Sequence, residues 1–209
     1  DFDRTVKEAK AHFGNKVVMV QYPHQTGVGF HEIIDVLRMT MYKFKDGGGK
    51  PEKLPIPDDE KAKAEELHKE LIEAIASNDE TLMEKYFDKG ELDEDEMKEE
   101  LKKAMINHDL FPLFCLSAER NMGSGRLMGF IDNVCPSANE MPSQITRNGE
   151  KLTCDANGPA CLFIYKTISE PHVGEMSFFK VYSGTIKVGM ELENESTGVS
   201  ERINQLFLV

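Results

Sequence analysis

Residues 111–123 read FPLFCLSAERNMG. The first part, Phe111–Leu116, is an apolar run of strand length, and the second part, Ser117–Gly123, consists mostly of small or polar residues. Apolar residues at helical spacing follow over Leu127–Val134, and the proline within Cys135–Ser137 ends that pattern. This order predicts a buried strand, a turn and a helix.

The region before this unit predicts a different arrangement of elements. Asp3–Phe13 has the pattern of a short helix, and Val17–Tyr22 that of one continuous apolar strand. Phe30–Phe44 alternates apolar and polar side chains, which predicts a further strand. The glycines and prolines of residues 46–57 predict a loop.

The glycine-rich part of that loop, DGGGK at residues 46–50, is not a phosphate-binding loop. Such a loop needs a glycine, four residues and then Gly-Lys-Ser/Thr at the start of a helix, so that backbone N–H groups surround the phosphates. Lys50 is followed instead by Pro51.

Most of the negative charge lies in one stretch of the chain. Residues 58–103 contain 18 acidic residues and 8 lysines, so they carry −10 of the net charge of −12. Leu67, Leu71 and Ile75 recur every four residues, which predicts an amphipathic helix. Charge of this kind is typical of the solvated face of such helices.

Capping residues predict two shorter helices after the first. Asp79 precedes a segment with helical periodicity and is expected to cap it. Asp93 stands three residues before Glu96, a variant of the capping box, while Leu92 and Met97 occupy the positions of a hydrophobic staple. The sequence therefore predicts three acidic helices in succession.

An all-β pattern begins after Pro159. The predicted strands are Cys161–Ile168, Met176–Tyr182, Thr185–Glu193 and Glu201–Leu208. Their spacing is typical of a small barrel or sandwich, here incomplete. The polar segment 142–158 is the predicted linker before them.

Composition excludes several classes of protein. With 40% apolar and 30% charged residues, the chain is not disordered as a whole. No apolar run approaches the ~18 residues that a membrane-spanning helix requires, and the first residues lack the pattern of a secretion signal. The negative charge argues against a broad electrostatic contact with nucleic acid and leaves a local contact open. No DNA partner is expected.

The cysteines carry no metal-binding or redox spacing. Cys115, Cys135, Cys154 and Cys161 include no pair separated by two residues, and no histidine pair has ligand spacing. We expect reduced, structural thiols, no metal site, and a cytoplasmic location.

Several motifs, in order along the chain, resemble bacterial elongation factor G. Ser-Ala followed by Asn-x-Gly within Ser117–Gly123 resembles the fifth GTPase motif of that family, and Phe-x-x-Val-Tyr-Ser-Gly at Phe178–Gly184 resembles the start of its second domain. Further matching segments are Val17–Asp35, Leu82–Tyr86, Glu94–Glu96, Cys135–Ser137, Glu170–Gly174 and Glu201–Ile203.

The resemblance implies an α+β fold, in which an α/β GTPase remnant with an inserted helical and strand subdomain precedes part of an all-β translation-factor barrel. Residues 1–143 are expected to form the C-terminal part of a GTPase domain, with the inserted G-prime subdomain at about 17–109. Residues 144–209 are expected to form the N-terminal part of the β-barrel domain II.

The resemblance also implies a function for the intact protein, which would be a GTPase that promotes translocation of tRNA and mRNA on the ribosome, with GTP or GDP and Mg²⁺ bound. The P-loop, the Asp-x-x-Gly motif and Asn-Lys-x-Asp do not occur in these 209 residues, and the resemblance places them before Asp1. These residues alone are therefore expected to be inactive and to bind no cofactor, with no catalytic residue among them.

One nucleotide element is present, at Ser117 and Ala118. By resemblance, this turn meets the guanine base. A backbone N–H there suits the O6 acceptor of guanine, whereas adenine presents an amino donor at the same place. A small side chain lets the base approach closely. We therefore expect Ser117 and Ala118 to bind the nucleotide.

The resemblance implies that the ribosome is the partner and that the protein is a monomer. The acidic helices would reach the ribosomal stalk protein, and the barrel domain would contact small-subunit RNA. We expect four acidic residues outside the apolar stripe to steer docking on the stalk: Glu73, Asp79, Glu80 and Glu84. No membrane contact is expected.

Two alternatives remain open. The glycine-rich loop and its proline-rich continuation are unlike the commonest form of elongation factor G. This difference leaves open a paralogous translational GTPase that acts in ribosome recycling or rescue. The other alternative is a non-enzymatic acidic module that docks on a protein partner.

Overall fold

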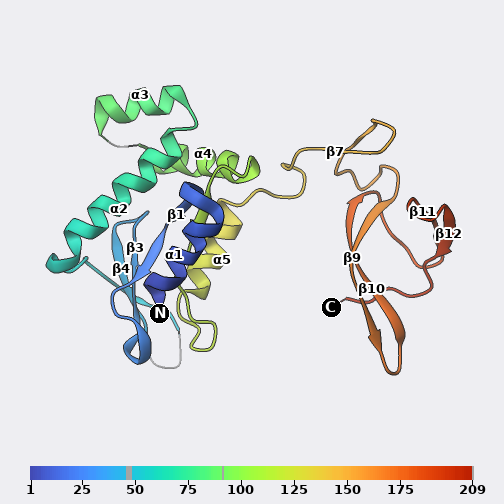
Figure 1. The fold of residues 1–209 in the computed structure, drawn as a ribbon, viewed down its shortest axis with the longest axis horizontal. Coiled ribbons are helices and arrows are strands. Elements are labelled where there is room, and N and C mark those ends of the chain that lie inside the picture. The colour runs from blue at the N-terminus through green and yellow to red at the C-terminus, as the bar shows by residue number, and fades with distance from the viewer. Residues whose placement is uncertain (46–48, 91, 209) are drawn as a thin grey trace. The chain divides into compact units, whose positions relative to one another are not determined.

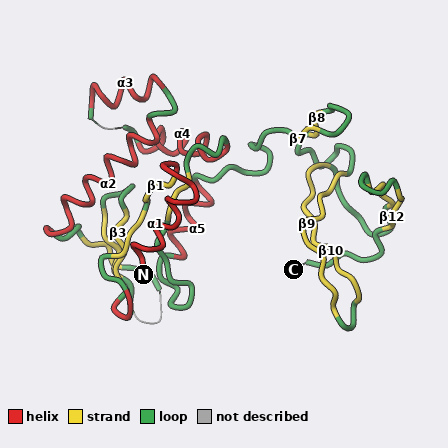
Figure 2. The backbone as a smooth tube through the Cα atoms, viewed as in Figure 1, coloured by secondary structure: helices red, strands yellow, loops and turns green. Residues whose placement is uncertain are grey.

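The computed structural model describes residues 1–45, 49–90 and 92–208 (Figure 1). Positions 46–48 of the predicted glycine-rich loop lie outside the described residues. The chain divides into two compact units, Asp1–Cys135 and Pro136–Val209. All α-helices of the described residues belong to the first unit (Figure 2), and none is long and apolar enough to cross a membrane. The fold is α+β, as predicted.

A pair of parallel strands forms one sheet of the first unit. Helix α1 (Phe2–Phe13) precedes β1 (Val17–Met19), which pairs with β6 (Phe111–Leu113). Helix α5 (Ser124–Asn133) follows β6 after a turn. The strand–turn–helix order predicted from residues 111–134 is confirmed, although the strand ends three residues earlier than predicted.

The prediction of one continuous strand over Val17–Tyr22 is wrong. The chain changes sheets at Val20, because the Val20 N–H donates to Leu113 O at 2.9 Å while its carbonyl accepts from Val36 N at 2.9 Å. After this residue, β2 (Gln21–Pro23) belongs to a second sheet. The apolar run continues because both sheets contribute to the same core.

The second sheet has four antiparallel strands in the order β2-β3-β4-β5. It contains β3 (Glu32–Asp35), β4 (Thr40–Lys43) and β5 (Glu52–Leu54). The predicted single strand over Phe30–Phe44 is therefore a hairpin, whose turn includes Met39 with a φ of 47°. The strand β5 also corrects the prediction of an uninterrupted loop over 46–57.

The three predicted acidic helices are confirmed as α2 (Asp58–Ala76), α3 (Glu80–Lys89) and α4 (Glu94–Ile106). Asp79 caps α3 by accepting from Leu82 N at 3.1 Å, and Asp93 and Glu96 form the predicted capping box of α4. Both staple residues are buried in one small cluster.

The main core joins α2, α4 and α5 to both sheets. It includes Leu71 and Ile75 of α2, Leu101 of α4, Ile34 of β3 and Phe130 of α5. Burying side chains of this size typically contributes about 1.5–3 kcal/mol each. Two of the acidic helices, α2 and α4, are thus packed on the sheet that adjoins the 111–123 segment, whereas α3 packs in the smaller cluster with the end of α2.

The second unit consists of three separate two-stranded antiparallel sheets. The pairs are β7 (Gln144–Ile145) with β8 (Lys151–Leu152), β9 (Cys161–Glu170) with β10 (Gly174–Ser183), and β11 (Glu191–Asn194) with β12 (Val199–Arg202). The first two predicted strands are confirmed, but the predictions of Thr185–Glu193 and Glu201–Leu208 are largely wrong, since β11 and β12 overlap them only at residues 191–193 and 201–202. Among the described residues of this unit, only Ser183 is buried, so these sheets enclose no core of their own.

Candidate functional site

The Ser-Ala segment lies in a tight loop closed by backbone hydrogen bonds. Ser117 and Met122 exchange two of them, N to O, each at 2.9 Å. Within this bridge, Asn121 donates to Ala118 O at 3.1 Å and has a φ of 50°. The loop follows β6 and precedes α5, so it lies at the carboxyl end of a strand in a parallel pair. Ligands of α/β proteins commonly bind at such an edge.

The two predicted nucleotide residues differ in what their backbone can offer. The N–H of Ser117 is taken by Met122. Ala118 is exposed, and no acceptor for its N–H is found in the part of the chain that the structure describes. Ala118 therefore presents a free donor to solvent, and its own side chain is small.

The four-stranded sheet supports the other end of this loop. Met122 is 1% exposed and packs in a cluster with Ile33, Tyr42, Phe44 and Cys115. The loop is thus anchored through a buried side chain to β3 and β4 of the sheet, as well as to the end of β6.

An ion pair between a buried aspartate and a partly exposed arginine fixes the following helix to the same sheet. Arg126 Nε of α5 donates to Asp35 Oδ2 of β3 at 2.7 Å, and the Asp35 side chain is fully buried. Gln21 Nε2 donates to the same oxygen at 3.1 Å, and the backbone N–H of Arg38 donates to Oδ1 at 2.9 Å. Sequence patterns alone did not reveal this network. Its local signal was a polar residue directly after an apolar run in each case, Gln21 after residues 17–20 and Asp35 after Ile33 and Ile34.

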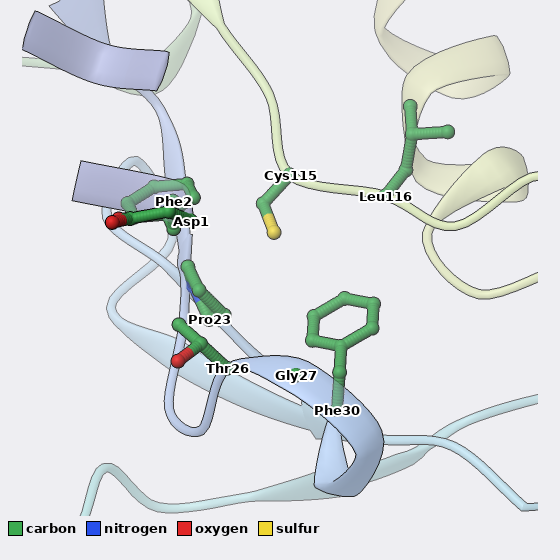
Figure 3. Close-up of a pocket in the computed structure, with 8 residues that line it drawn as sticks. All are labelled: Asp1, Phe2, Pro23, Thr26, Gly27, Phe30, Cys115 and Leu116. Atoms are coloured by element: carbon green, nitrogen blue, oxygen red, sulfur yellow. The ribbon is translucent and has the colours of Figure 1, made fainter. Parts of the chain in front are cut away.

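An open pocket of about 620 Å³ lies beside the loop (Figure 3). Thr26, Gly27 and Phe30 line one side, and Cys115 and Leu116 line the other. In Figure 3 the Cys115 sulfur is directed into the space between them. Burial raises the pKa of the Cys115 thiol to about 11, so it remains protonated at neutral pH and is a poor nucleophile. Asp1, Phe2 and Pro23 complete the lining.

The four acidic residues expected to steer docking do not share one environment. Glu80 and Glu84 are exposed on α3. Glu73 of α2 lies 3.7 Å from Lys69 Nζ and is half exposed. Asp79 is engaged as the cap of α3, so its carboxylate has a structural role.

No cluster that could hold a metal ion is found among the described residues. The candidate site of this chain therefore consists of backbone groups of the Ser117–Met122 loop and the pocket beside it.

Comparison with known proteins places the fold. No family model matches the sequence. The structure is similar to the crystal structure of ttk003000868 from Thermus thermophilus, with a TM-score of 0.72 and 24% sequence identity. The two proteins share a fold. The similarity covers 97% of this chain but only 28% of the Thermus chain, so these residues span less than a third of that protein's length.

Proposed function

We propose that these residues belong to a GTPase that acts on the ribosome in translation, with translocation of tRNA and mRNA as its step. The observation that carries the proposal is the free N–H of Ala118, exposed at the carboxyl end of β6 and immediately before α5. The order of motifs resembling elongation factor G supports it.

The chemistry of this donor favours guanine over adenine. Guanine offers its O6 acceptor to a backbone N–H, whereas adenine offers an amino group that would face the same N–H as a second donor. The neighbouring Ser117 uses its N–H to close the loop, so Ala118 supplies the free donor of the pair. Phosphate binding, metal binding and hydrolysis require motifs that do not occur in this sequence, and we assign them to the remainder of the intact protein.

The proposal is tested by Ala118→Pro in the intact protein. Proline removes the N–H, and losing a hydrogen bond to a desolvated partner costs about 1–3 kcal/mol. We expect GTP and GDP affinity to fall by roughly tenfold to a hundredfold, measured by calorimetry.

Ala118→Gly is the matched control, because it shortens the same side chain but retains the N–H. It is expected to bind both nucleotides within roughly twofold of the unaltered protein, since no hydrogen bond is lost. Equal affinities for the proline and glycine variants would show that the loop has only a structural role.

A docking role for the acidic helices is a second candidate function, and we propose the lysine-bearing stalk protein of the ribosome as the partner. Glu80, Glu84 and Asp88 are exposed on α3, and Phe87 between them is 75% exposed. Long-range attraction of this kind acts mainly on the association rate and weakens as salt rises.

Reversal of charge on α3 tests this candidate. We expect Glu80→Lys with Glu84→Lys to slow ribosome-stimulated GTP hydrolysis several-fold at low salt and to leave intrinsic nucleotide binding unchanged. Asp79 is left intact because it caps the helix.

The control pair, Glu175→Lys with Glu195→Lys, changes the net charge equally at exposed positions of the second unit. If both pairs slow the stimulated rate equally, net charge and not docking by α3 is responsible.

A further inference from the structure

We infer that Arg120 is a positioning residue for the nucleotide loop: through its bond to Val28, it fastens the outer part of the loop to the segment between β2 and β3. This inference rests on the proposed function. It concerns a contact that lies outside the Ser-Ala pair.

The contact joins segments that are far apart in the sequence. Arg120 Nη1 donates to the carbonyl oxygen of Val28 at 3.3 Å, across 92 residues. Arg120 lies two residues after Ala118, within the part of the loop that the Ser117–Met122 bridge encloses. Val28 lies at the tip of the 3₁₀ turn Gly27–Gly29, and its side chain is 91% exposed.

The segment that carries Val28 is itself fixed to the sheet. Glu32 at its C-terminal end is buried, and its carboxylate lies 2.8 Å from His24 Nδ1 and 2.9 Å from Lys43 Nζ. Hydrogen bonds from Lys43 and His24 hold the pKa of Glu32 below its ordinary value, so this carboxylate is ionised at neutral pH. The carbonyl of Val28 is therefore presented from an anchored segment.

Apolar packing does not reach the outer part of the nucleotide loop. Met122 anchors the inner end in its buried cluster, but Ala118 and Arg120 are exposed. Between the two segments lies the open pocket, with Gly27 and Phe30 facing Cys115 and Leu116 (Figure 3).

The bond from Arg120 spans from this exposed part to the anchored segment. Without it, the Ala118 N–H would sample more orientations, and a bound base would lose a preorganised donor.

The experiment measures release of a fluorescent GDP analogue from the intact protein during a chase with excess GDP. A net hydrogen bond corresponds to a roughly three- to tenfold change in an equilibrium, and we expect Arg120→Ala to accelerate release by that factor. Arg147→Ala, the same substitution at an exposed position outside the loop and the pocket, is expected to leave the release rate unchanged. The melting temperature is recorded for both variants, and a purely structural role would lower it without affecting release.

A second variant disturbs the same hydrogen bond from its other side, at the turn that carries Val28. Gly27 has a φ of +83°, so Gly27→Val strains the turn and displaces the Val28 carbonyl. Both single variants should accelerate release, and the double variant should be no faster than Arg120→Ala alone, because both remove one interaction.

Additive effects, or unchanged release from Arg120→Ala, would overturn this inference while leaving the proposed function standing. An intact protein that binds no guanine nucleotide would overturn both.

Discussion

Replacing Arg126 with methionine is expected to lower the free energy of unfolding of residues 1–135 by about 3 kcal/mol. The substitution keeps an apolar stem of similar length but removes the guanidinium that lies 2.7 Å from Asp35. Asp35 is fully buried, and a buried charge that loses its partner costs about 3–5 kcal/mol. We choose the lower end because Gln21 and the Arg38 N–H still donate to the carboxylate.

Urea denaturation followed by helical circular dichroism measures this effect in residues 1–209, since the described α-helices all lie in the first unit. The matched control adds Asp35→Asn to Arg126→Met. It removes the stranded charge while the asparagine oxygen can still accept from Arg38 N, so more than half of the lost stability should return. A loss below about 1 kcal/mol in the single variant would mean that the pair contributes little beyond its packing.

The helices of the first unit could be predicted because their signals are local. Asp79, Asp93 and Glu96 identify the starts of α3 and α4 through side-chain bonds to nearby backbone N–H groups. The stripe of Leu71 and Ile75 identifies the buried face of α2 in the same way. Each of these signals spans only a few residues, and the structure confirms all of them.

The strands before α2 could not be predicted as well, because partner choice is not local. Val20 is apolar like its neighbours, and nothing in the run indicates that its N–H and carbonyl bond to different sheets. The turn at Met39 was equally hidden, since methionine at a positive φ carries none of the usual turn chemistry. At both positions the backbone conformation depends on strand pairing with residues that are distant in the sequence or across the hairpin.

The candidate site was predictable in part. The Ser117–Gly123 turn follows from a strand-length apolar run that ends in small and polar residues. Two side-chain hydrogen bonds support this turn, from Arg126 to Asp35 and from Arg120 to Val28. Each joins residues about 90 positions apart, and hydrophobic periodicity does not reveal such pairs. Sequence patterns thus locate the loop, whereas the structure shows what holds it.

Gly123, at the end of this turn, has almost no room for a side chain. It begins α5 with a φ of +80°, a conformation that costs most other residues about 1–2 kcal/mol. A Cβ added there would lie 2.9 Å from the carbonyl oxygen of Cys115 and 3.0 Å from Ile33 Cδ1. Backbone atoms cannot move aside cheaply, and overpacking adds about 1–3 kcal/mol.

Gly123→Ala is therefore expected to destabilise the first unit by about 3 kcal/mol in the same denaturation experiment. Gly125→Ala is the matched control: Gly125 lies two residues further on, in the first turn of α5, has no neighbour within 4 Å of an added Cβ, and does not need a positive φ. That substitution is expected to stabilise the unit by up to about 1 kcal/mol, because alanine favours the helix. If Gly123→Ala lowers the free energy of unfolding while Gly125→Ala raises it, the close contact with the Cys115 backbone leaves no room for a side chain at Gly123. Two stabilising substitutions would instead show that the contact with Cys115 relaxes without cost.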